Sequence, residues 1–318
     1  MNNKLNKNLL EFLDRAKITS KNIYALQNDA SKRIYYRGLD KKNQFLLMDS
    51  SLEKNSLKSF INISKWLRVK GYSAPKIYHK NLSKGYCILE DFGDTKFSDI
   101  KTKNIKKKYE LTINLLASLS KLRPPFYLNN YSRIIFMKEL NLFINWHLFY
   151  NKDISKLAIL SWKNIWNSLF HKINNYKKKS IVLRDFHIDN LFWLNNKENI
   201  KKIGLIDFQD ALIGHPCYDL VSLLQDVRSN ISNKEQLNLY NYYVSISNVE
   251  KKLFEEAYFI FGTQRLIKII GIFYRLKYLY NKNNYMKYIP RAWKLLKNNL
   301  NFPPLKELSN WFENYVFK

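Results

Sequence analysis

The N-terminal part of the chain alternates between short apolar runs and longer stretches in which apolar residues recur every three or four positions. The helical spacing covers residues 5–18 and 55–70, which we expect to form two helices. Strand-like runs occur at residues 34–37, 44–48, 76–79 and 86–89. The first two runs predict a hairpin, so this region predicts a small antiparallel sheet accompanied by helices.

Beyond residue 93 the pattern becomes mainly helical. Apolar residues at helical spacing mark long segments at residues 105–122, 132–150, 154–176, 258–280 and 291–300. Short apolar runs at 181–183, 191–194 and 203–206 predict brief strands within this region. The expected fold class is α+β with two lobes, a small antiparallel-sheet N-lobe at residues 1–92 and a larger, mainly helical C-lobe at residues 93–318.

The segment between residues 182 and 210 carries the most informative polar residues. Asp185 follows a predicted strand, Asn190 lies five positions later, and Asp207 follows the next predicted hairpin. Phosphoryl transfer requires a carboxylate that orients the acceptor hydroxyl and accepts its proton, and oxygen ligands that hold Mg²⁺ against the phosphates of ATP. We therefore interpret Asp185 as the catalytic base and Asn190 and Asp207 as magnesium ligands. An Asp and an Asn at this spacing also occur in capped turns, but the flanking strands and the second acidic motif favour catalysis.

These segments resemble the aminoglycoside phosphotransferase and choline kinase superfamily, which shares the protein-kinase-like fold, over nearly the whole chain. A narrower similarity to the bacterial anomeric kinases of cell-wall amino sugars is carried by residues 139–146, 184–190, 205–220 and 264–275. Those kinases phosphorylate N-acetylmuramate and N-acetylglucosamine. The resemblance implies an ATP- and Mg²⁺-dependent kinase that transfers the γ-phosphoryl group to the anomeric hydroxyl of such a sugar. It also implies that the N-lobe binds the nucleotide and the C-lobe binds the sugar.

The resemblance implies roles for further residues. Asp219, which opens the helix after the motif, is similar to a residue that ties down the catalytic loop, so we expect a structural role. Glu90 ends a strand at the expected lobe junction, where adenine would bind, and is a cofactor-binding candidate. The candidates for sugar contacts are Glu139, Trp146, His187 and Arg265. Their structural alternatives are packing for the Trp, loop backbone contacts for the His, and a buried ion pair for the charged residues.

The sequence departs from the family pattern at three places. Leu183 replaces a His that commonly precedes the Arg-Asp pair, although this removes neither the base nor a magnesium ligand. The third predicted strand carries no Lys for the ATP phosphates, a feature shared with the amino sugar kinases, and the first turn carries no Gly. Arg33 and Arg37, together with Tyr36, are candidates to bind the phosphates instead, and the alternative for them is an exposed hairpin face.

The net charge changes the list of expected partners little. The formal charge of +28, from 54 Lys and Arg against 26 Asp and Glu, raises nucleic acid as a partner. However, the basic residues are spread along the chain, and Lys accompanies abundant Asn, Ile and Tyr, as A/T-rich codons dictate. We therefore expect a small-molecule sugar substrate and disfavour nucleic acid as a partner, while anionic ATP would benefit from the charge.

Cysteine spacing and hydropathy indicate the cellular compartment in which the protein is expected. Cys87 and Cys217 are far apart and lack the spacing of a disulfide framework or a zinc site, which predicts a reducing environment. The N-terminal segment is polar and amphipathic, and no apolar run reaches about 18 residues. We expect a cytoplasmic protein without a membrane partner, and a monomer is the favoured state.

Two other interpretations stay open. A kinase of the same fold would act on choline, ethanolamine, homoserine or an aminoglycoside, but cationic acceptors call for an acidic or aromatic pocket and the predicted C-lobe is rich in Lys. A pseudokinase scaffold is suggested by the missing third-strand Lys and the missing Gly-rich turn. Against the scaffold, Asp185, Asn190 and Asp207 are all present, and a scaffold does not need all three.

Overall fold

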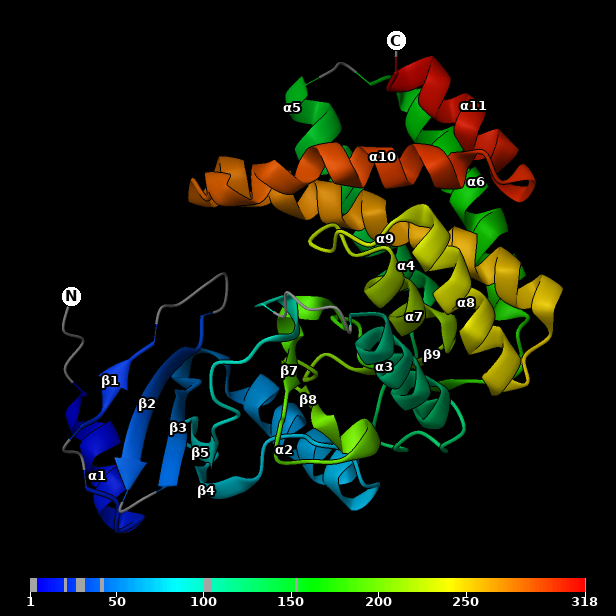
Figure 1. The fold of residues 1–318 in the computed structure, drawn as a ribbon. Coiled ribbons are helices and arrows are strands. Elements are labelled where there is room, and N and C mark those ends of the chain that lie inside the picture. The colour runs from blue at the N-terminus through cyan, green and yellow to red at the C-terminus, as the bar shows by residue number, and fades with distance from the viewer. Residues whose placement is uncertain are drawn as a thin grey trace. The chain divides into compact units, whose positions relative to one another are not determined.

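The computed structural model describes residues 5–19, 22–26, 32–40, 43–99, 105–151 and 154–317. Of the first turn predicted at residues 29–33, positions 29–31 lie outside these ranges. The chain divides into two compact units, the first formed by residues 1–102 and 189–211 and the second by residues 103–188 and 212–318 (Figure 1). The nucleotide and substrate roles expected of two lobes that meet at residue 92 stay predictions.

The first unit is built on a five-stranded antiparallel sheet with the strand order β1-β2-β3-β5-β4. Its strands are β1 (Tyr24–Ala25), β2 (Ile34–Asp40), β3 (Asn43–Asp49), β4 (Ile77–Asn81) and β5 (Tyr86–Glu90). In the observed register, Leu47 pairs with Tyr36 on one side and with Ile88 on the other. The four strands predicted here overlap β2 to β5, and β2 pairs with β3 as the predicted hairpin.

Helix α1 (Lys7–Arg15) packs its apolar face into the core of the first unit. Leu9, Phe12 and Leu13 are buried in one cluster with residues of β2, β3 and β5. The side chain of Asn6 caps the helix by accepting the backbone N–H of Leu9 at 2.9 Å. The spacing of these three apolar residues, at i, i+3 and i+4, is the pattern that predicted the helix.

Residues 189–211 join the first unit rather than the helices that flank them in sequence. This segment contains β7 (Leu191–Trp193), the 3₁₀ turn η5 (Asn199–Lys202) and β8 (Ile203–Leu205), and it contacts helix α2 (Lys54–Val69). The N–H of Leu205 donates to the carbonyl of Ser73 at 2.8 Å. The ring of Phe208 stacks on that of Phe60 with centroids 5.0 Å apart. A lobe boundary at residue 92 would assign this hairpin to the C-lobe, because local periodicity carries no information on such long-range contacts.

The second unit is mainly helical. Its longer helices are α3 (Ile105–Leu119), α4 (Arg133–Phe143), α6 (Lys156–Asn174), α7 (Cys217–Leu224), α8 (Asn233–Ser247), α9 (Lys251–Tyr280), α10 (Ile289–Leu300) and α11 (Lys306–Tyr315). Its short elements are the π-helical η3 (Ile144–Leu148), α5 (Phe149–Asn151), the 3₁₀ turns η6 (Asn283–Tyr288) and η7 (Pro303–Leu305), and the antiparallel strands β6 (Ser180–Val182) and β9 (Leu212–Gly214).

Helix α9 is the central element of the second unit, where it packs against α4, α6, α7 and α10. A helix surrounded by others buries several faces, which explains why α9 is apolar around much of its circumference. The segment predicted as one helix at residues 132–150 is divided into α4, a π-helical turn and α5. A π-helical turn inserts one residue into the helix. The spacing of apolar residues does not change enough to predict this insertion.

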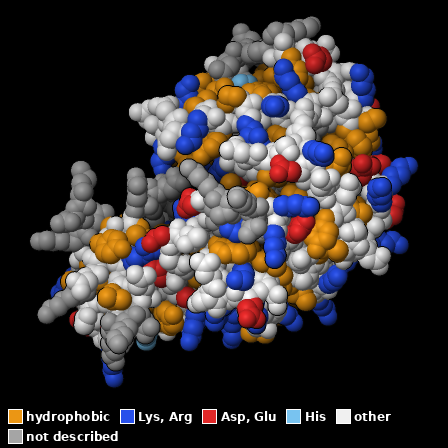
Figure 2. All heavy atoms as spheres, in the orientation of Figure 1, with side chains coloured by type: hydrophobic (Ala, Val, Ile, Leu, Met, Phe, Trp, Pro, Cys, Tyr) orange, Lys and Arg blue, Asp and Glu red, His pale blue; other side chains and the backbone are white. Residues whose placement is uncertain are grey.

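Both units confirm the predicted α+β architecture, with the antiparallel sheet in one and the helices in the other. None of the helices in the described ranges combines the length and the apolar character that a bilayer crossing requires. On the face shown in Figure 2, Lys and Arg side chains are scattered among Asp and Glu rather than gathered in one patch.

The packing of α1 predicts unequal effects for two leucines of that helix. Leu13 is fully buried, whereas Leu10 is 38% exposed. Leu13→Ala should lower the free energy of unfolding by about 2 to 5 kcal/mol because it opens a cavity, and Leu10→Ala should change it by less than about 1 kcal/mol. Urea titration followed by circular dichroism measures both. Equal midpoints for the two variants would show that α1 does not pack as described.

Candidate active site

Asn190 and Asp207 lie together in the first unit, at the open end of the β7–β8 hairpin. Asn190 precedes β7 and Asp207 follows β8, so antiparallel pairing of these strands brings the two residues side by side. The Nδ2 of Asn190 donates to Oδ2 of Asp207 at 3.3 Å. Asp207 has a left-handed backbone with φ of 58°, which non-glycine residues seldom adopt. The side chain of Asp207 is 43% exposed, so its carboxylate is accessible.

The donor set of this pair fits a divalent cation of the Mg²⁺ type. A carboxylate and an amide supply the oxygen ligands that such hard cations prefer. Within the described ranges, no group of three or more His, Cys, Asp or Glu is placed to hold a metal ion. Mg²⁺ is commonly bound by one or two carboxylates, with water and phosphate oxygens completing the shell, so a larger cluster is not required. Metal binding by Asn190 and Asp207 stays a prediction.

A buried guanidinium lies beside this pair. Arg33, which directly precedes β2, is only 4% exposed, and its Nη1 donates to Oε1 of Gln209 at 2.9 Å. The same Nη1 is 4.0 Å from Oδ1 of Asp207. Gln209 also donates from Nε2 to that Oδ1 at 2.9 Å, so it bridges the two charged residues. On the other side, Nε of Arg33 is 3.7 Å from Oε2 of Glu53, at the end of the 3₁₀ turn η1 (Ser51–Glu53).

The other two cofactor-binding candidates are engaged in ion pairs elsewhere in the first unit. Arg37 donates to Oδ1 of Asp94 at 2.6 Å and to Oδ1 of Asp91 at 3.1 Å. Burial lowers the pKa of Arg37, but these two carboxylates outweigh it and raise the pKa overall. Glu90 pairs with Arg68 at 3.2 Å. These contacts fix the segment after β5, so Arg33 is the candidate that lies beside Asp207.

The loop that carries Asp185 belongs to the second unit and follows β6. Two buried carboxylates hold its backbone. Asp219, which the sequence suggested would tie down this loop, accepts the N–H of Leu183 at 2.6 Å and that of Arg184 at 3.0 Å. Asp226 accepts the N–H of Ile188 at 3.1 Å. Burial raises the pKa of Asp219 to about 7, an effect that the two backbone N–H donors oppose.

Glu139 lies at the centre of a buried charge network in the second unit. Its carboxylate accepts a hydrogen bond from Nη2 of Arg184, is 2.8 Å from Nζ of Lys268, and accepts the hydroxyl of Tyr131 at 2.5 Å. Gln264 donates to it as well, at 2.9 Å. Burial alone would raise the pKa of Glu139, but Lys268 and Arg184 lower it to about 2. The carboxylate is therefore ionised and joins α4, α9 and the loop.

The remaining sugar-contact candidates differ in their surroundings. Arg265 on α9 is 3% exposed, yet its guanidinium makes no hydrogen bond or ion pair with any described residue. Its charge helps to lower the pKa of buried His187, after burial itself and Arg228, so Arg265 lies within electrostatic range of the loop. Trp146, in the π-helical turn, stacks on Tyr150 with centroids 5.7 Å apart. Contact of these residues with a sugar stays a prediction.

Residues 23–248 match the phosphotransferase enzyme family. The chain belongs to this family. Over 272 residues this phosphotransferase is 29% identical to an N-acetylmuramate/N-acetylglucosamine kinase of Caulobacter vibrioides, covering 81% of the chain and 74% of the relative. Over 288 residues it is 28% identical to the protein of the same name from Neisseria meningitidis serogroup B, covering 85% of the chain and 83% of the relative.

Solved structures show the same fold at lower identity. The choline kinase LicA from Streptococcus pneumoniae matches with a TM-score of 0.65 and 16% identity, covering 92% of this phosphotransferase and 98% of LicA. The ADP-bound aminoglycoside phosphotransferase APH(2'')-Ib matches with a TM-score of 0.62 and 16% identity, covering 92% and 97%. The predicted superfamily and the prediction that the chain is a phosphotransferase enzyme are thereby confirmed.

Sequence reasoning missed several residues of the site in this phosphotransferase. The missed residues are Gln209, Asp226, Gln264 and Lys268. Lys268 carried a usable signal, because it is a charged residue within the apolar stretch of α9, as is Arg265. The sequence suggested a buried ion pair for Glu139 and Arg265. The structure gives Glu139 the partners Arg184 and Lys268 instead, because their side chains converge on it from the loop and from α9.

The charge network predicts a pH-dependent stability difference between the wild type and Glu139→Gln. The variant leaves Arg184 and Lys268 buried without their carboxylate. Its free energy of unfolding should therefore be lower than that of the wild type by about 3 to 5 kcal/mol near neutral pH. The folded-state pKa of Glu139 lies near 2, below the usual 4.5, so the stabilisation is complete above 4.5 and is lost as the pH falls toward 2. Urea titrations at several pH values should show the two proteins converging in acid.

A surface glutamate provides the matched control. Glu110 is partly exposed and pairs with the exposed Lys106 at 3.8 Å, one helical turn away. Glu110→Gln should change the free energy of unfolding by no more than about 0.5 kcal/mol at any pH. A Glu139→Gln variant that behaves like this control would show that the buried network does not stabilise the protein.

Proposed function

We propose that this phosphotransferase transfers the γ-phosphoryl group of ATP to a sugar hydroxyl, the anomeric hydroxyl of N-acetylmuramate or N-acetylglucosamine, in the presence of Mg²⁺. The observation that carries the proposal is the contact between Asn190 and Asp207 beside the buried charge of Arg33. The names of the relatives from Caulobacter vibrioides and Neisseria meningitidis support the choice of acceptor.

In the proposed mechanism Asp185 accepts the proton of the acceptor hydroxyl, whose oxygen attacks the γ-phosphorus, and ADP leaves. Asn190 and Asp207 would hold Mg²⁺, which neutralises charge on the phosphates when it is bound. Arg33 would supply the positive charge that many kinases obtain from a Lys on the third strand. Asp219 and Asp226 fix the backbone around Asp185, so little reorganisation of the base is required during the reaction.

The charges around the loop in the second unit favour an anionic acceptor over a cationic one. Asp185 is among the groups that raise the pKa of Lys268, which places this lysine within electrostatic range of the base. Glu139 is already paired with two cations, whereas Arg265 makes no ion pair with any described residue. A buried guanidinium of this kind is stabilised by a carboxylate ligand. We infer that Arg265 binds the lactyl carboxylate of N-acetylmuramate.

An acceptor panel tests the reaction. The panel contains N-acetylmuramate, N-acetylglucosamine, choline, ethanolamine, homoserine and an aminoglycoside, with ATP, Mg²⁺ and coupled detection of ADP. We expect turnover of the two amino sugars, and phosphorus NMR of the product should place the phosphate on the anomeric oxygen. Strong turnover of choline with none of the sugars would refute the assigned acceptor. Absence of Mg²⁺-dependent ATP binding by calorimetry would favour the scaffold interpretation.

Two substitutions test the assigned roles. Asp185→Asn should lower kcat by about 10² to 10⁴ because it removes the base while preserving the shape of the side chain. Asp207→Asn should shift the Mg²⁺ dependence of the reaction to higher concentration because it removes a charged ligand. Asp14→Asn, on the exposed side of α1, is the control and should leave both quantities unchanged. Near wild-type turnover in Asp185→Asn would disprove the base assignment.

The role of Arg265 predicts a change in acceptor discrimination. Arg265→Gln should lower kcat/KM for N-acetylmuramate about 10- to 100-fold more than for N-acetylglucosamine, since only the former carries a carboxylate. Arg275→Gln is a matched control on the same helix, about 15 Å further along its axis. It should affect both sugars equally. Equal losses for both sugars in Arg265→Gln would show that Arg265 supports the fold rather than the acceptor.

A further inference from the structure

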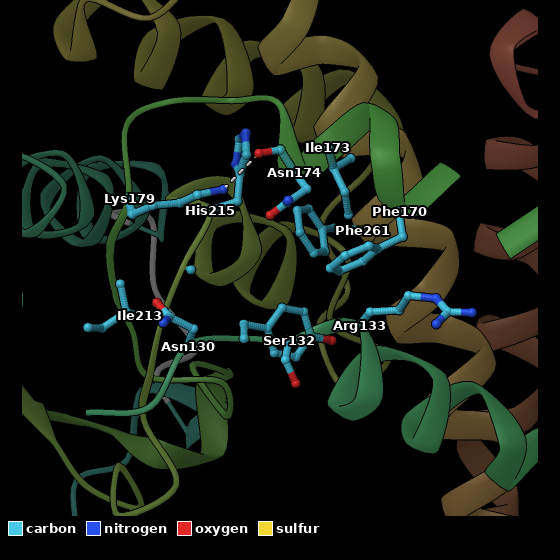
Figure 3. A pocket seen from close by; sticks show the side chains of 12 residues that line it. Asn130, Ser132, Arg133, Phe170, Ile173, Asn174, Lys179, Ile213, His215 and Phe261 are labelled. Carbon is cyan, nitrogen blue, oxygen red and sulfur yellow. Dashed lines mark hydrogen bonds between the residues drawn. The ribbon is translucent and has the colours of Figure 1, made fainter. Parts of the chain in front are cut away.

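The second unit contains a cavity of about 230 Å³ whose lining includes no residue of the loop that carries Asp185. Its walls are the segment at residues 130–133, which leads into α4, the C-terminal end of α6, strand β9 with the residue after it, Lys179 before β6, and Phe261 of α9. Figure 3 shows Asn130 and Ser132 on one side of the opening, and Asn174 and Phe261 on the other. The cavity is distinct from the site assigned to phosphoryl transfer.

The lining of this cavity is positively charged. It includes Lys179 and Arg133 but no Asp or Glu. Nζ of Lys179 donates to the carbonyl of Asn174 at 3.3 Å, and Nε of Arg133 donates to Oδ1 of Asn167 at 2.7 Å. Neither cation forms an ion pair with a carboxylate in the described part of the chain. Partial burial lowers the pKa of Lys179, so an anion in the cavity would stabilise its charged form.

A buried histidine presents an unmatched hydrogen-bond donor at the same cavity. His215 lines the cavity and is 2% exposed. Its Nδ1 accepts the N–H of Cys217 at 3.1 Å, which places the proton of the neutral ring on Nε2. Nε2 is buried and has no hydrogen-bond partner among the described residues. Such donors are rarely left unsatisfied in folded proteins, and an acceptor atom of a bound ligand would satisfy this one.

The other walls match an anion attached to an apolar body. Ser132 is the N-cap of α4, so the positive end of the helix dipole borders the cavity. Phe170, Ile173 and Phe261 contribute apolar surface to the lining. An inorganic ion would leave this surface uncovered, whereas a ring or a branched chain would cover it.

Two wall residues are also bonded to groups that fix the catalytic loop. Tyr131 donates its hydroxyl to Glu139, the partner of Arg184. His215 accepts the first N–H of α7, the helix whose Asp219 holds the loop backbone. A ligand that contacts Tyr131 or His215 is therefore one hydrogen bond from the supports of the loop.

We propose that this cavity is an effector site that binds a small organic anion, a carboxylate or phosphate ester on an apolar body, and that its occupancy is transmitted to the loop at residues 183–188. The anionic group contacts Lys179 and Nε2 of His215, and the apolar body lies against Phe170 and Phe261. This proposal does not depend on the identity of the phosphate acceptor.

Binding is tested by fluorine NMR on the full chain with 4-fluorobenzoate, and with 4-fluorobenzamide as its uncharged counterpart. We expect a dissociation constant on the order of 1 mM for the carboxylate, as is usual for so small a ligand, and no saturation for the amide. Lys179→Ala should weaken carboxylate binding at least about fivefold because it removes the charge at the cavity. Lys178→Ala, the exposed neighbour, is the matched control and should bind as the wild type does.

Three outcomes would overturn the proposed site. Absence of saturation up to about 20 mM carboxylate would mean that the cavity holds only water. Equal binding of the amide, or unchanged binding in Lys179→Ala, would exclude an anion site. Loss of binding in Arg265→Gln but not in Lys179→Ala would place the probe in the acceptor site instead. Transmission is tested separately by hydrogen exchange, and unchanged exchange at residues 183–188 under saturating carboxylate would refute it.

Discussion

The buried carboxylate of Asp219 is the constraint on which the loop that carries Asp185 depends. The loop leaves β6 and turns at Arg184, whose φ of 72° is left-handed, so its backbone N–H groups have no strand partner. Asp219 accepts two of these N–H groups, and Asp226 accepts a third, at Ile188. A buried N–H without an acceptor costs about 1 to 3 kcal/mol, so without these carboxylates the loop would favour another conformation. Both carboxylates are supplied by α7 and the turn after it, and the position of Asp185 is thereby set by a helix some thirty residues further along the chain.

The same region shows how charge is distributed for function. The carboxylate of Glu139 pairs with both Arg184 and Lys268. Each of these charges is stabilised by its partners, because a buried charge without a partner would be poorly solvated. Arg265, on the same helix as Lys268, has no such partner among the described residues. The charge of Arg265 acts instead on Asp219, whose pKa it helps to lower, so among the described residues this guanidinium lies within electrostatic range of the loop without a direct ion pair.

The first unit places a buried positive charge beside Asp207. Arg33 takes a place beside Asp207, and Gln209 is hydrogen-bonded to both. A guanidinium has five donors in a fixed plane, so it contacts Gln209 and Ser56 together and retains its charge when buried. Arg37, an equally plausible candidate by sequence, is neutralised by Asp91 and Asp94.

The sequence by itself determined the elements whose signals are local. Periodicity located α1, α2 and most strands. The spacing of Asp185, Asn190 and Asp207 indicated phosphoryl transfer, because residues this close in sequence can be brought together by short strands and turns. The family and the enzyme class followed from the same residues. Only the tertiary structure decided that hairpin 189–211 belongs to the same unit as the sheet, that Lys268 rather than Arg265 pairs with Glu139, and that Arg33 rather than Arg37 lies beside Asp207. Each of these depends on contacts between residues far apart in the chain. Such contacts are selected by packing and by the need to neutralise buried charge. Neither requirement produces a periodic pattern of apolar residues along the sequence.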